Sequence, residues 1–482
     1  MDLNLQALLP ELILTLAACG VMTIDLFLPK EKRGMAFPLA VVGILATLAA
    51  VLMLYGQNIT TLDGMFVVDR FAVIFKIVFC VAALLVFAVS QPYLNDDNDV
   101  PHGEYFTMMM FSLLGMLTIA SSRDLIAIFV ALEMISLPAF ILAGIRKNDI
   151  RSNEAALKFF LFGVLSTALM LFGMSLFYGL TGATNLADVS EGLAGRTDID
   201  EVALLAILFL IVGFGFKVSA FPFQWWVPDT YEGAPIPVAA FLSVASKTAG
   251  FVGLFQVMFL GLGELADMWR PMFAVIGIVT MTFGNLVAIQ QKQIVRLLAY
   301  SSIAQAGYML VPLGVASATN GEVNTQIVFS VVAYLLVYAF METGAFAVAT
   351  AFGRKTGKYL IEDYAGLFAR SPALAVAMAA FLFSLAGIPP FAGWWAKFVI
   401  FQTLIEGEGL WLAVIMAVNT VIAMFYYLAV VKKMFVDKPE DAAAVPMPKV
   451  LAGAIGIAAV VVTVGGFLPD LFGKLATNSN FF

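Results

Sequence analysis

The chain has 482 residues, of which 62% are hydrophobic and 12% charged, with a formal net charge of −7 and a mean hydropathy of +0.96. Because a soluble domain carries about 25% charged residues, this composition excludes a soluble globular protein and predicts an all-α integral membrane protein. Two cysteines in separate spans and a single histidine give no basis for a disulfide framework, a metal site or a bis-histidine haem, and we expect no nucleic acid among the partners.

The hydrophobic segments predict about fourteen transmembrane helices, if each crossing takes about 20 apolar residues. They lie near residues 8–28, 36–55, 68–90, 105–121, 125–145, 157–180, 202–227, 235–260, 271–290, 295–315, 325–352, 372–404, 410–431 and 450–468. The longest gap, Thr181 to Asp200, leaves no room for an inserted soluble domain. The first span lacks a preceding basic segment, so we expect no cleavable signal peptide.

The distribution of lysine and arginine predicts the orientation, because cytoplasmic loops carry an excess of both. With both termini outside, the cytoplasmic loops hold Lys30, Lys32, Arg33, Arg146, Lys147, Arg151, Lys292, Arg296, Arg354, Lys355, Lys358, Arg370, Lys432, Lys433, Lys438 and Lys449. The outer loops hold only Arg70, Arg123, Arg196, Arg270 and Lys474. We therefore predict that both termini face the outer, periplasmic side of the membrane.

An internal repeat is visible around two proline-broken spans. The segment 222–226, PFQWW in the seventh span, is echoed by 390–395, PFAGWW in the twelfth. The two copies are five helices apart, an odd number, so the second copy is inverted, and inverted repeats with broken helices are a transporter architecture. The alternative is that proline and tryptophan are merely common at membrane interfaces. We predict two inverted five-helix repeats, helices 4–8 and 9–13, and four segments: 1–104, 105–260, 271–431 and 450–482.

Four ionisable residues lie deep inside predicted spans: Glu133, Lys217, Lys247 and Lys397. A charge at the bilayer centre costs roughly 2.5–3.5 kcal/mol on insertion scales, and such residues usually mark an ion or proton path. Static explanations stay open for each. Glu133 and Lys217 could form a helix-packing ion pair, backbone carbonyls could satisfy Lys247, and Lys397 could snorkel to the interface.

Further polar residues in the spans are weaker candidates. Glu342 is the only carboxylate inside the eleventh span, where it could serve as a charge partner for the second unit. Lys158 lies within a turn of a cytoplasmic end and Lys76 within two turns of an outer end, so snorkelling is expected for Lys76 and competes with a functional role for Lys158. The tenth span could extend a polar chain through Arg296, Ser301, Ser302 and Gln305.

Five segments within helices 4–13 carry a resemblance to a known family. They are SSRDLIAIFVALEMISLPAFILAG, SNEAALKFFLFG, FKVSAFPFQWWVPDTYEGAP, QKQIVRLLAYSSIAQAGYML and FSLAGIPPFAGWWAKF. The chain resembles the antiporter-like membrane subunits of bacterial proton-translocating NADH:quinone oxidoreductase, respiratory complex I, and subunit N most of all. The wider family includes multisubunit sodium/proton antiporters.

The resemblance implies specific roles. Glu133 and Lys217 would form the pair of the first half-channel, Lys158 would belong to its input side, Lys247 would be the central relay and Lys397 the residue nearest the outer exit. Gln305 departs from the family, since many relatives have a histidine there. The resemblance also implies a bacterial inner-membrane location, with other membrane and peripheral subunits of complex I as partners. NADH, FMN, iron–sulfur clusters and quinone are expected in those subunits and not in this chain.

These observations predict a proton-translocating subunit of a redox-driven translocase. Glu133 and the three lysines would pass protons along water-filled links, while the driving chemistry takes place elsewhere. Two alternatives remain. A secondary transporter or a subunit of a sodium/proton antiporter would use the same broken helices, and a passive scaffold would use the charges only to hold helices together.

Overall fold

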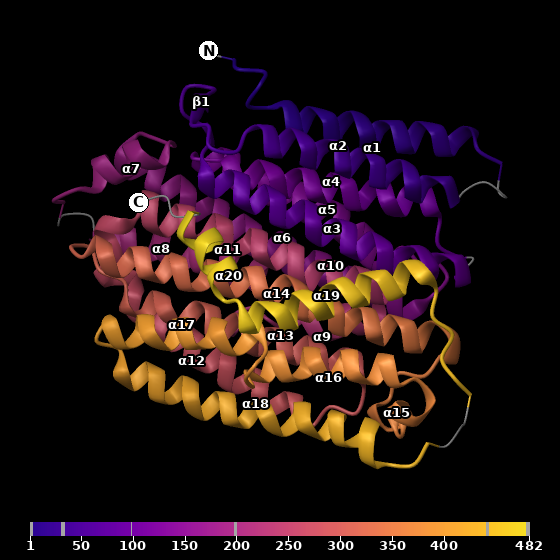
Figure 1. The fold of residues 1–482 in the computed structure, drawn as a ribbon. Coiled ribbons are helices and arrows are strands. Elements are labelled where there is room, and N and C mark those ends of the chain that lie inside the picture. The colour runs from indigo at the N-terminus through magenta and orange to yellow at the C-terminus, as the bar shows by residue number, and fades with distance from the viewer. Residues whose placement is uncertain (1–2, 30–33, 98, 197–199, 440–442, 479–482) are drawn as a thin grey trace.

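Long helices run roughly parallel through most of the chain in the computed structural model, which describes residues 3–29, 34–97, 99–196, 200–439 and 443–478 (Figure 1). Within these residues, thirteen helical segments are long and apolar enough to cross a bilayer alone. Twelve are α1 (Leu9–Phe27), α2 (Ala36–Met53), α3 (Arg70–Asp96), α4 (His102–Ser121), α5 (Leu125–Ala143), α6 (Ile150–Thr181), α8 (Asp200–Val218), the segment η4–α12 (Gly263–Leu265 and Ala266–Ala288), the segment α13–η5 (Ile294–Leu310 and Val311–Val315), α14 (Gly321–Thr356), α18 (Leu410–Val436) and α19 (Lys449–Phe467).

The thirteenth segment, Ile236–Gly261, is one rod with two π-helical turns. It consists of α10 (Ile236–Phe241), η2 (Leu242–Ser246), α11 (Lys247–Phe255) and η3 (Gln256–Gly261), where η2 and η3 are the π-helical turns. A π-helical turn holds one extra residue per turn and often marks a functional site. Lys247 is the first residue after such a turn.

The predicted twelfth span is broken where its prolines predict and consists of two half-helices: α16 (Pro372–Ala386) and α17 (Ala392–Glu406). Each is too short to cross alone, but together they make one more crossing, which brings the total to the predicted fourteen. An even number returns the chain to the side where it started, and both termini lie toward the same end of the bundle in Figure 1.

The seventh span is also broken where its proline predicts. α8 ends at Val218, and after the Phe221–Pro222 segment the chain resumes as the short helix α9 (Trp226–Gly233). α8 starts at the end of the bundle that carries α7 (Leu186–Leu193), whereas α16 starts at the opposite end, beside α15 (Leu367–Arg370) (Figure 1). The two broken helices therefore run in opposite directions, as an inverted repeat requires.

Small elements occupy loops where the sequence predicted none. The strands β1 (Ile59–Thr61) and β2 (Phe66–Val68) form an antiparallel hairpin, so the chain is not purely helical. The hairpin is fixed on its neighbours, because Arg123 N donates to Met65 O at 2.9 Å. The remaining short elements are η6 (Ile361–Tyr364) and α20 (Asp470–Asn478).

Helix ends follow local chemistry. Asp124 accepts hydrogen bonds from the backbone N–H groups of Ile126 and Ala127 and so caps α5, which carries Glu133. Asp69 caps α3 in the same way. A side-chain acceptor satisfies N–H groups that the first helical turn leaves free. Gly357 ends α14 with φ 64°, a left-handed conformation that glycine adopts without strain.

Close backbone contacts hold the second broken helix. A Cβ atom at Gly466 of α19 would lie 1.6 Å from Pro390 O, and one at Gly393 would lie 2.0 Å from Ser384 O. Only glycine lets backbones approach so closely. The last long helix, α19, therefore packs directly on the break between α16 and α17.

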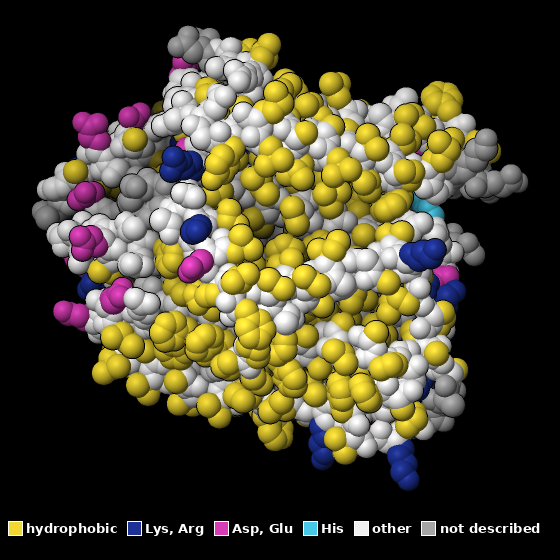
Figure 2. All heavy atoms as spheres, in the orientation of Figure 1, with side chains coloured by type: hydrophobic (Ala, Val, Ile, Leu, Met, Phe, Trp, Pro, Cys, Tyr) yellow, Lys and Arg dark blue, Asp and Glu magenta, His cyan; other side chains and the backbone are white. Residues whose placement is uncertain are grey.

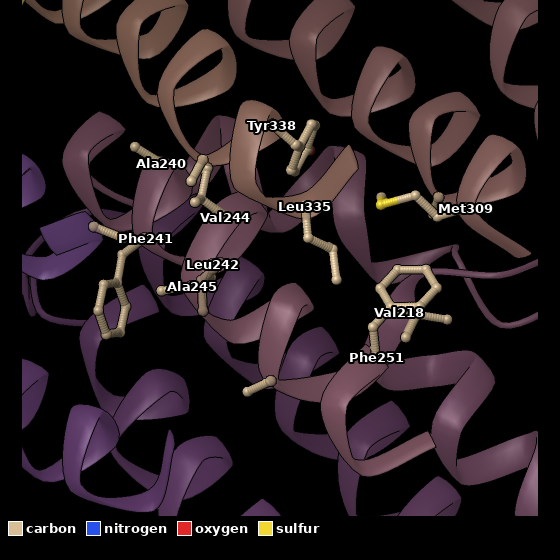
Figure 3. Packing of buried hydrophobic residues seen from close by; sticks show 14 of the residues in the cluster. Val218, Ala240, Phe241, Leu242, Val244, Ala245, Phe251, Met309, Leu335 and Tyr338 are labelled. Carbon is tan, nitrogen blue, oxygen red and sulfur yellow. The ribbon is translucent and has the colours of Figure 1, made fainter. Parts of the chain in front are cut away.

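Apolar side chains form both the interior and the outer surface. Figure 2 shows a hydrophobic belt across the middle of the face in view, with acidic side chains gathered at its left end. Inside, Figure 3 shows Val218, Phe251, Met309 and Leu335, which come from four different helices, in one buried cluster. We call the end that holds Arg146, Lys292, Arg354 and Lys433 the basic end. The predicted cytoplasmic residues Lys30, Lys32 and Arg33 lie outside the described residues.

Candidate functional site

Lys217 and Glu133 come from two neighbouring parts of the fold without forming a direct ion pair. Lys217 lies in the last turn of α8, just before the break, and its side chain is buried. Its Nζ donates to Ser136 Oγ of α5 at 3.0 Å. Glu133, one turn earlier on α5, is half-buried; its Oε1 is enclosed without a hydrogen-bond partner among the described residues, and its charge acts on Lys217 electrostatically. The two predicted partners are therefore electrostatic neighbours, and the hydrogen bond of Lys217 goes to Ser136.

Lys247 is held by one residue of α13. Its Nζ donates to Ser302 O at 2.8 Å and to Ser302 Oγ at 3.0 Å, and the side chain is 1% exposed. A lysine carries three N–H donors, so one remains for water or another acceptor. The backbone-carbonyl contact that was an open alternative is present, and it is accompanied by a hydroxyl.

Glu342 lies in the same region as Lys247. The carboxylate is completely buried in α14, Ser243 Oγ donates to its Oε1 at 3.1 Å, and Glu342 and Lys247 interact electrostatically. Ser243 also bonds the hydroxyl of Tyr338 at 3.0 Å. Ser243 stands four residues before Lys247 on the same rod, which puts both on one helix face. The structure thus gives Lys247 an acidic neighbour, as Lys217 has in Glu133.

Gln305 is the centre of a hydrogen-bonded group that the sequence only hinted at. Its Nε2 donates to Tyr427 Oη at 3.1 Å and to Leu385 O at 3.2 Å, and its Oε1 accepts a hydrogen bond from Tyr334. Tyr427 also bonds Ser301, the residue next to the serine that holds Lys247. An amide donates and accepts but does not titrate near neutral pH, so Gln305 fixes the two tyrosines without itself exchanging a proton.

Lys397 lies at the break of the second broken helix and does not snorkel. Its side chain is 2% exposed, and Nζ donates to Leu385 O at 2.9 Å and to Ala386 O at 3.3 Å. These are the last carbonyls of α16, the negative end of that half-helix, which favours a cation. Nζ also lies 4.5 Å above the ring of Tyr308. Lys397 and Gln305 share the Leu385 carbonyl, so the group around Gln305 reaches Lys397.

Lys158 belongs to a charge network at the basic end. Its Nζ lies 2.7 Å from Glu154 and 2.6 Å from Asp229 of α9, and Asp229 also accepts from Arg296 at 3.0 Å. Burial would raise the pKa of the Asp229 carboxyl, but the hydrogen bonds from Lys158 and Arg296 outweigh burial and hold that pKa below its usual value. Lys158 is thus paired and partly exposed, next to the short helix that follows the break after Lys217.

The expectation that Lys76 snorkels to the interface is wrong. Lys76 is fully buried in α3, and its Nζ forms an ion pair with Glu11 Oε1 of α1 at 2.7 Å. The ammonium also lies 4.8 Å from the centre of the Phe66 ring. Glu11, a buried acid in the first turn of α1, therefore balances the charge of Lys76 inside the bundle. This pair lies apart from the lysines described above.

Sequence reasoning missed Ser136 and three tyrosines, Tyr334, Tyr338 and Tyr427. Part of the signal was available. Tyr334, Tyr338 and Glu342 follow one another at intervals of four residues, which places them on one face of α14. Tyr427 stands next to a second tyrosine in the middle of a mostly apolar stretch, which also marks a polar position. Ser136 had no signal, because serines are common in transmembrane helices.

The chain is similar to known membrane subunits over its whole length. Residues 122–423 match the family model described as NADH:quinone oxidoreductase/Mrp antiporter, TM. NADH-quinone oxidoreductase subunit N of Moorella thermoacetica is 38% identical, with 99% of this chain and 98% of that protein covered, and subunit N 2 of Rhizobium meliloti is 39% identical, with 98% and 97% covered.

A solved structure supports the same grouping. A chain of respiratory complex I from Thermus thermophilus superimposes with a TM-score of 0.80 at 30% identity, covering 97% of this chain and 99% of that one. The match extends over both broken helices and over α19, which lies beyond the family model. The chain therefore belongs to the antiporter-like membrane-subunit family of NADH:quinone oxidoreductase and the Mrp antiporters.

Proposed function

We propose that this chain is the proton-translocating subunit N of a bacterial NADH:quinone oxidoreductase, and that Glu133, Lys217, Lys247 and Lys397 carry the protons. The observation that carries the proposal is the polar series inside an apolar bundle. Lys247 binds Ser302, the adjacent Ser301 binds Tyr427, Tyr427 binds Gln305, and Gln305 shares a carbonyl with Lys397. The relatives named subunit N support the assignment.

The geometry suggests a mechanism in which each lysine is poised between two states. A buried ammonium is costly, so its charge depends on a nearby carboxylate. Lys217 has Glu133 and Lys247 has Glu342 as that neighbour. A change of charge at one acid therefore alters proton binding at its lysine, and because the groups are coupled, the change passes along the series.

Lys397 differs from the other two lysines. Its direct contacts are backbone carbonyls and an aromatic ring rather than a carboxylate. A cation at a half-helix end is stabilised by a fixed dipole, so Lys397 holds the last proton of the series. Because Gln305 itself does not titrate, that proton reaches Lys397 through water from the side of the Tyr427 hydroxyl, and it leaves toward the outer end of α17. Lys158, Asp229 and Arg296 form the polar surface at which protons enter on the side of α9.

The proposal also includes the orientation in the membrane, the two repeats and the partner subunits. The basic end faces the cytoplasm, since cytoplasmic ends carry the excess of lysine and arginine, and both termini face outward. Segments 105–260 and 271–431 are the two inverted repeats, flanked by 1–104 and 450–482. NADH, FMN, iron–sulfur clusters and quinone belong to the partner subunits of the membrane and peripheral arms, and their redox chemistry supplies the energy.

The test is Lys247→Ala in the assembled complex, reconstituted in proteoliposomes without sodium. We expect fewer protons moved per electron, because the link between Ser302 and the carboxylate of Glu342 is cut. An unchanged ratio would contradict the relay. A ratio that depends on added sodium in the parent complex would favour the antiporter alternative. Loss of assembly with full pumping in the assembled fraction would favour a scaffold.

A further inference from the structure

A cavity of about 500 Å³ opens at the basic end between α12, α13 and α18. Polar side chains, among them Gln291, Lys292 and Lys433, line its outer part, and Tyr426 also lines it. Tyr426 and Lys433 both lie on α18, seven residues apart, so the cavity reaches about 10 Å along the helix at about 1.5 Å per residue. Tyr426 is 2% exposed and lies deeper in the bundle than Lys433.

Two hydrogen bonds and one ring contact connect this cavity to Lys397. Tyr426 Oη donates to Asn285 Oδ1 at 3.1 Å, and Asn285 Nδ2 donates to Tyr308 Oη at 3.0 Å. The Tyr308 ring lies under Lys397 Nζ. If protons could pass along this series, Lys397 would be in contact with the basic end by a route that bypasses Lys217 and Lys247.

Asn285 is the weak conductor in the series. An amide side chain accepts at its oxygen and donates at its nitrogen, and neither atom ionises near neutral pH. A second amide fixes it, because Asn285 Nδ2 also donates to Asn419 O at 3.1 Å and to Asn419 Oδ1 at 3.2 Å. Asn285 and Asn419 are both buried, and all their side-chain polar atoms are engaged. No free amide atom is left to bind a mobile water.

The helix backbones beside this amide pair are also closely packed. A Cβ atom on Gly284 would lie 2.6 Å from Ala304 N, and one on Gly307 would lie 2.4 Å from Met281 N. α12 and α13 are therefore in direct backbone contact next to Asn285 and next to Tyr308. Polar groups that lie this deep usually mark a path, yet here they are closed by non-titrating groups.

We propose that the Asn285–Asn419 amide pair is a proton seal that separates Lys397 from the cavity at the basic end. The inference rests on the proposed function, in which Lys397 exchanges protons with the outer side. Protons held outside by the gradient would otherwise return through Lys397, Tyr308 and Tyr426. The amides satisfy the buried tyrosine hydroxyls, which an apolar plug would leave unpaired, and they do so without conducting.

The experiment measures passive proton leak in proteoliposomes that contain the complete complex without NADH. An imposed pH difference is followed with an internal dye. Asn285→Asp keeps the shape but introduces a titrating carboxyl, and we expect it to speed the decay by at least about tenfold, a modest effect beside the roughly 10²–10⁴-fold that a positioned acid–base group contributes to a reaction. The matched control Asn285→Leu removes the hydrogen bonds but adds no titrating group, and proteoliposomes with this variant are expected to leak protons no faster than those with the parent complex.

Second substitutions locate the leak. Tyr426→Phe or Lys397→Leu, added to Asn285→Asp, should each restore a slow decay, because they cut the route on either side. A leak that survives both, or an assembled Asn285→Asp complex as tight as the parent, would overturn the proposal. Asn419→Asp gives the same readout if the first variant does not assemble. The assay needs no turnover, so a failed seal is distinct from a failed relay, which Lys247→Ala reveals during NADH oxidation.

Discussion

The buried ion pair between Lys76 and Glu11 gives a quantitative prediction about stability. Lys76 is completely buried, and the Glu11 side chain is 10% exposed, so water screens this pair very little. Lys76→Met removes the cation and leaves a buried carboxylate without its partner. Breaking a buried pair in this way costs about 3–5 kcal/mol, which is a large part of the roughly 5–15 kcal/mol that holds a typical domain folded.

The double variant distinguishes the pair from packing. Replacing both partners with apolar residues, Lys76→Met with Glu11→Leu, removes both charges, and such replacements are often neutral or stabilising. We expect each single variant to lower the temperature at which the subunit leaves the purified complex, and the double variant to recover most of the loss. The measurement is thermal dissociation followed by native gel electrophoresis.

Additive effects of the two substitutions would contradict a coupling between Lys76 and Glu11. If the loss of stability in the double variant equalled the sum of the losses in the two single variants, the two side chains would act independently. Coupled residues show an interaction energy and independent residues do not. Near-normal stability of Lys76→Met alone would mean that the lysine reaches water after all, as the sequence suggested.

Two further predictions concern the second break and the basic end. Gly466→Ala places a methyl group against Pro390 O and should destabilise the subunit by about 1–3 kcal/mol, the usual cost of overpacking; Gly456→Ala in the same helix meets nothing within 4 Å and should be harmless in the same thermal assay. Asp229→Asn should destabilise the basic end at neutral pH. The pKa of Asp229 is lowered in the folded chain, so its contribution to the free energy of unfolding is present above about pH 4 and is lost as the pH falls through the lowered pKa. The stabilities of the parent and the variant should therefore become equal in acid, which unfolding measured across pH will show.

The helices and their breaks follow from the sequence because they depend on local properties. Long apolar runs predict crossings, and proline at 222 and 389–390 predicts where two of them stop. The break in the twelfth span was predicted at Pro389–Pro390, but the 33-residue run 372–404 did not show that α16 ends at Ala386 and α17 begins at Ala392. The hairpin of β1 and β2 was missed because three-residue strands carry almost no periodicity.

The buried charges could be identified from the sequence, but most of their partners could not. A lysine in an apolar span is visible in any sequence, whereas its acceptor depends on which helix packs beside it. Lys217 therefore bonds Ser136 rather than Glu133, and Lys397 bonds carbonyls that exist only because α16 ends at Ala386. The prediction that Lys76 snorkels was wrong because its partner is Glu11, 65 positions earlier in the chain, and the sequence does not show that these two residues lie together.

The proposed relay requires that Lys217, Lys247 and Lys397 exchange protons and are not merely static charges. The most direct measurement is the number of protons moved per electron by the complex with Lys217→Arg, in proteoliposomes oxidising NADH. Arginine keeps the positive charge next to Glu133 but does not release its proton in proteins. The proposed relay predicts a lower ratio with electron transfer still detectable. An unchanged ratio in a fully assembled complex would mean that charge alone is sufficient, and would contradict the account.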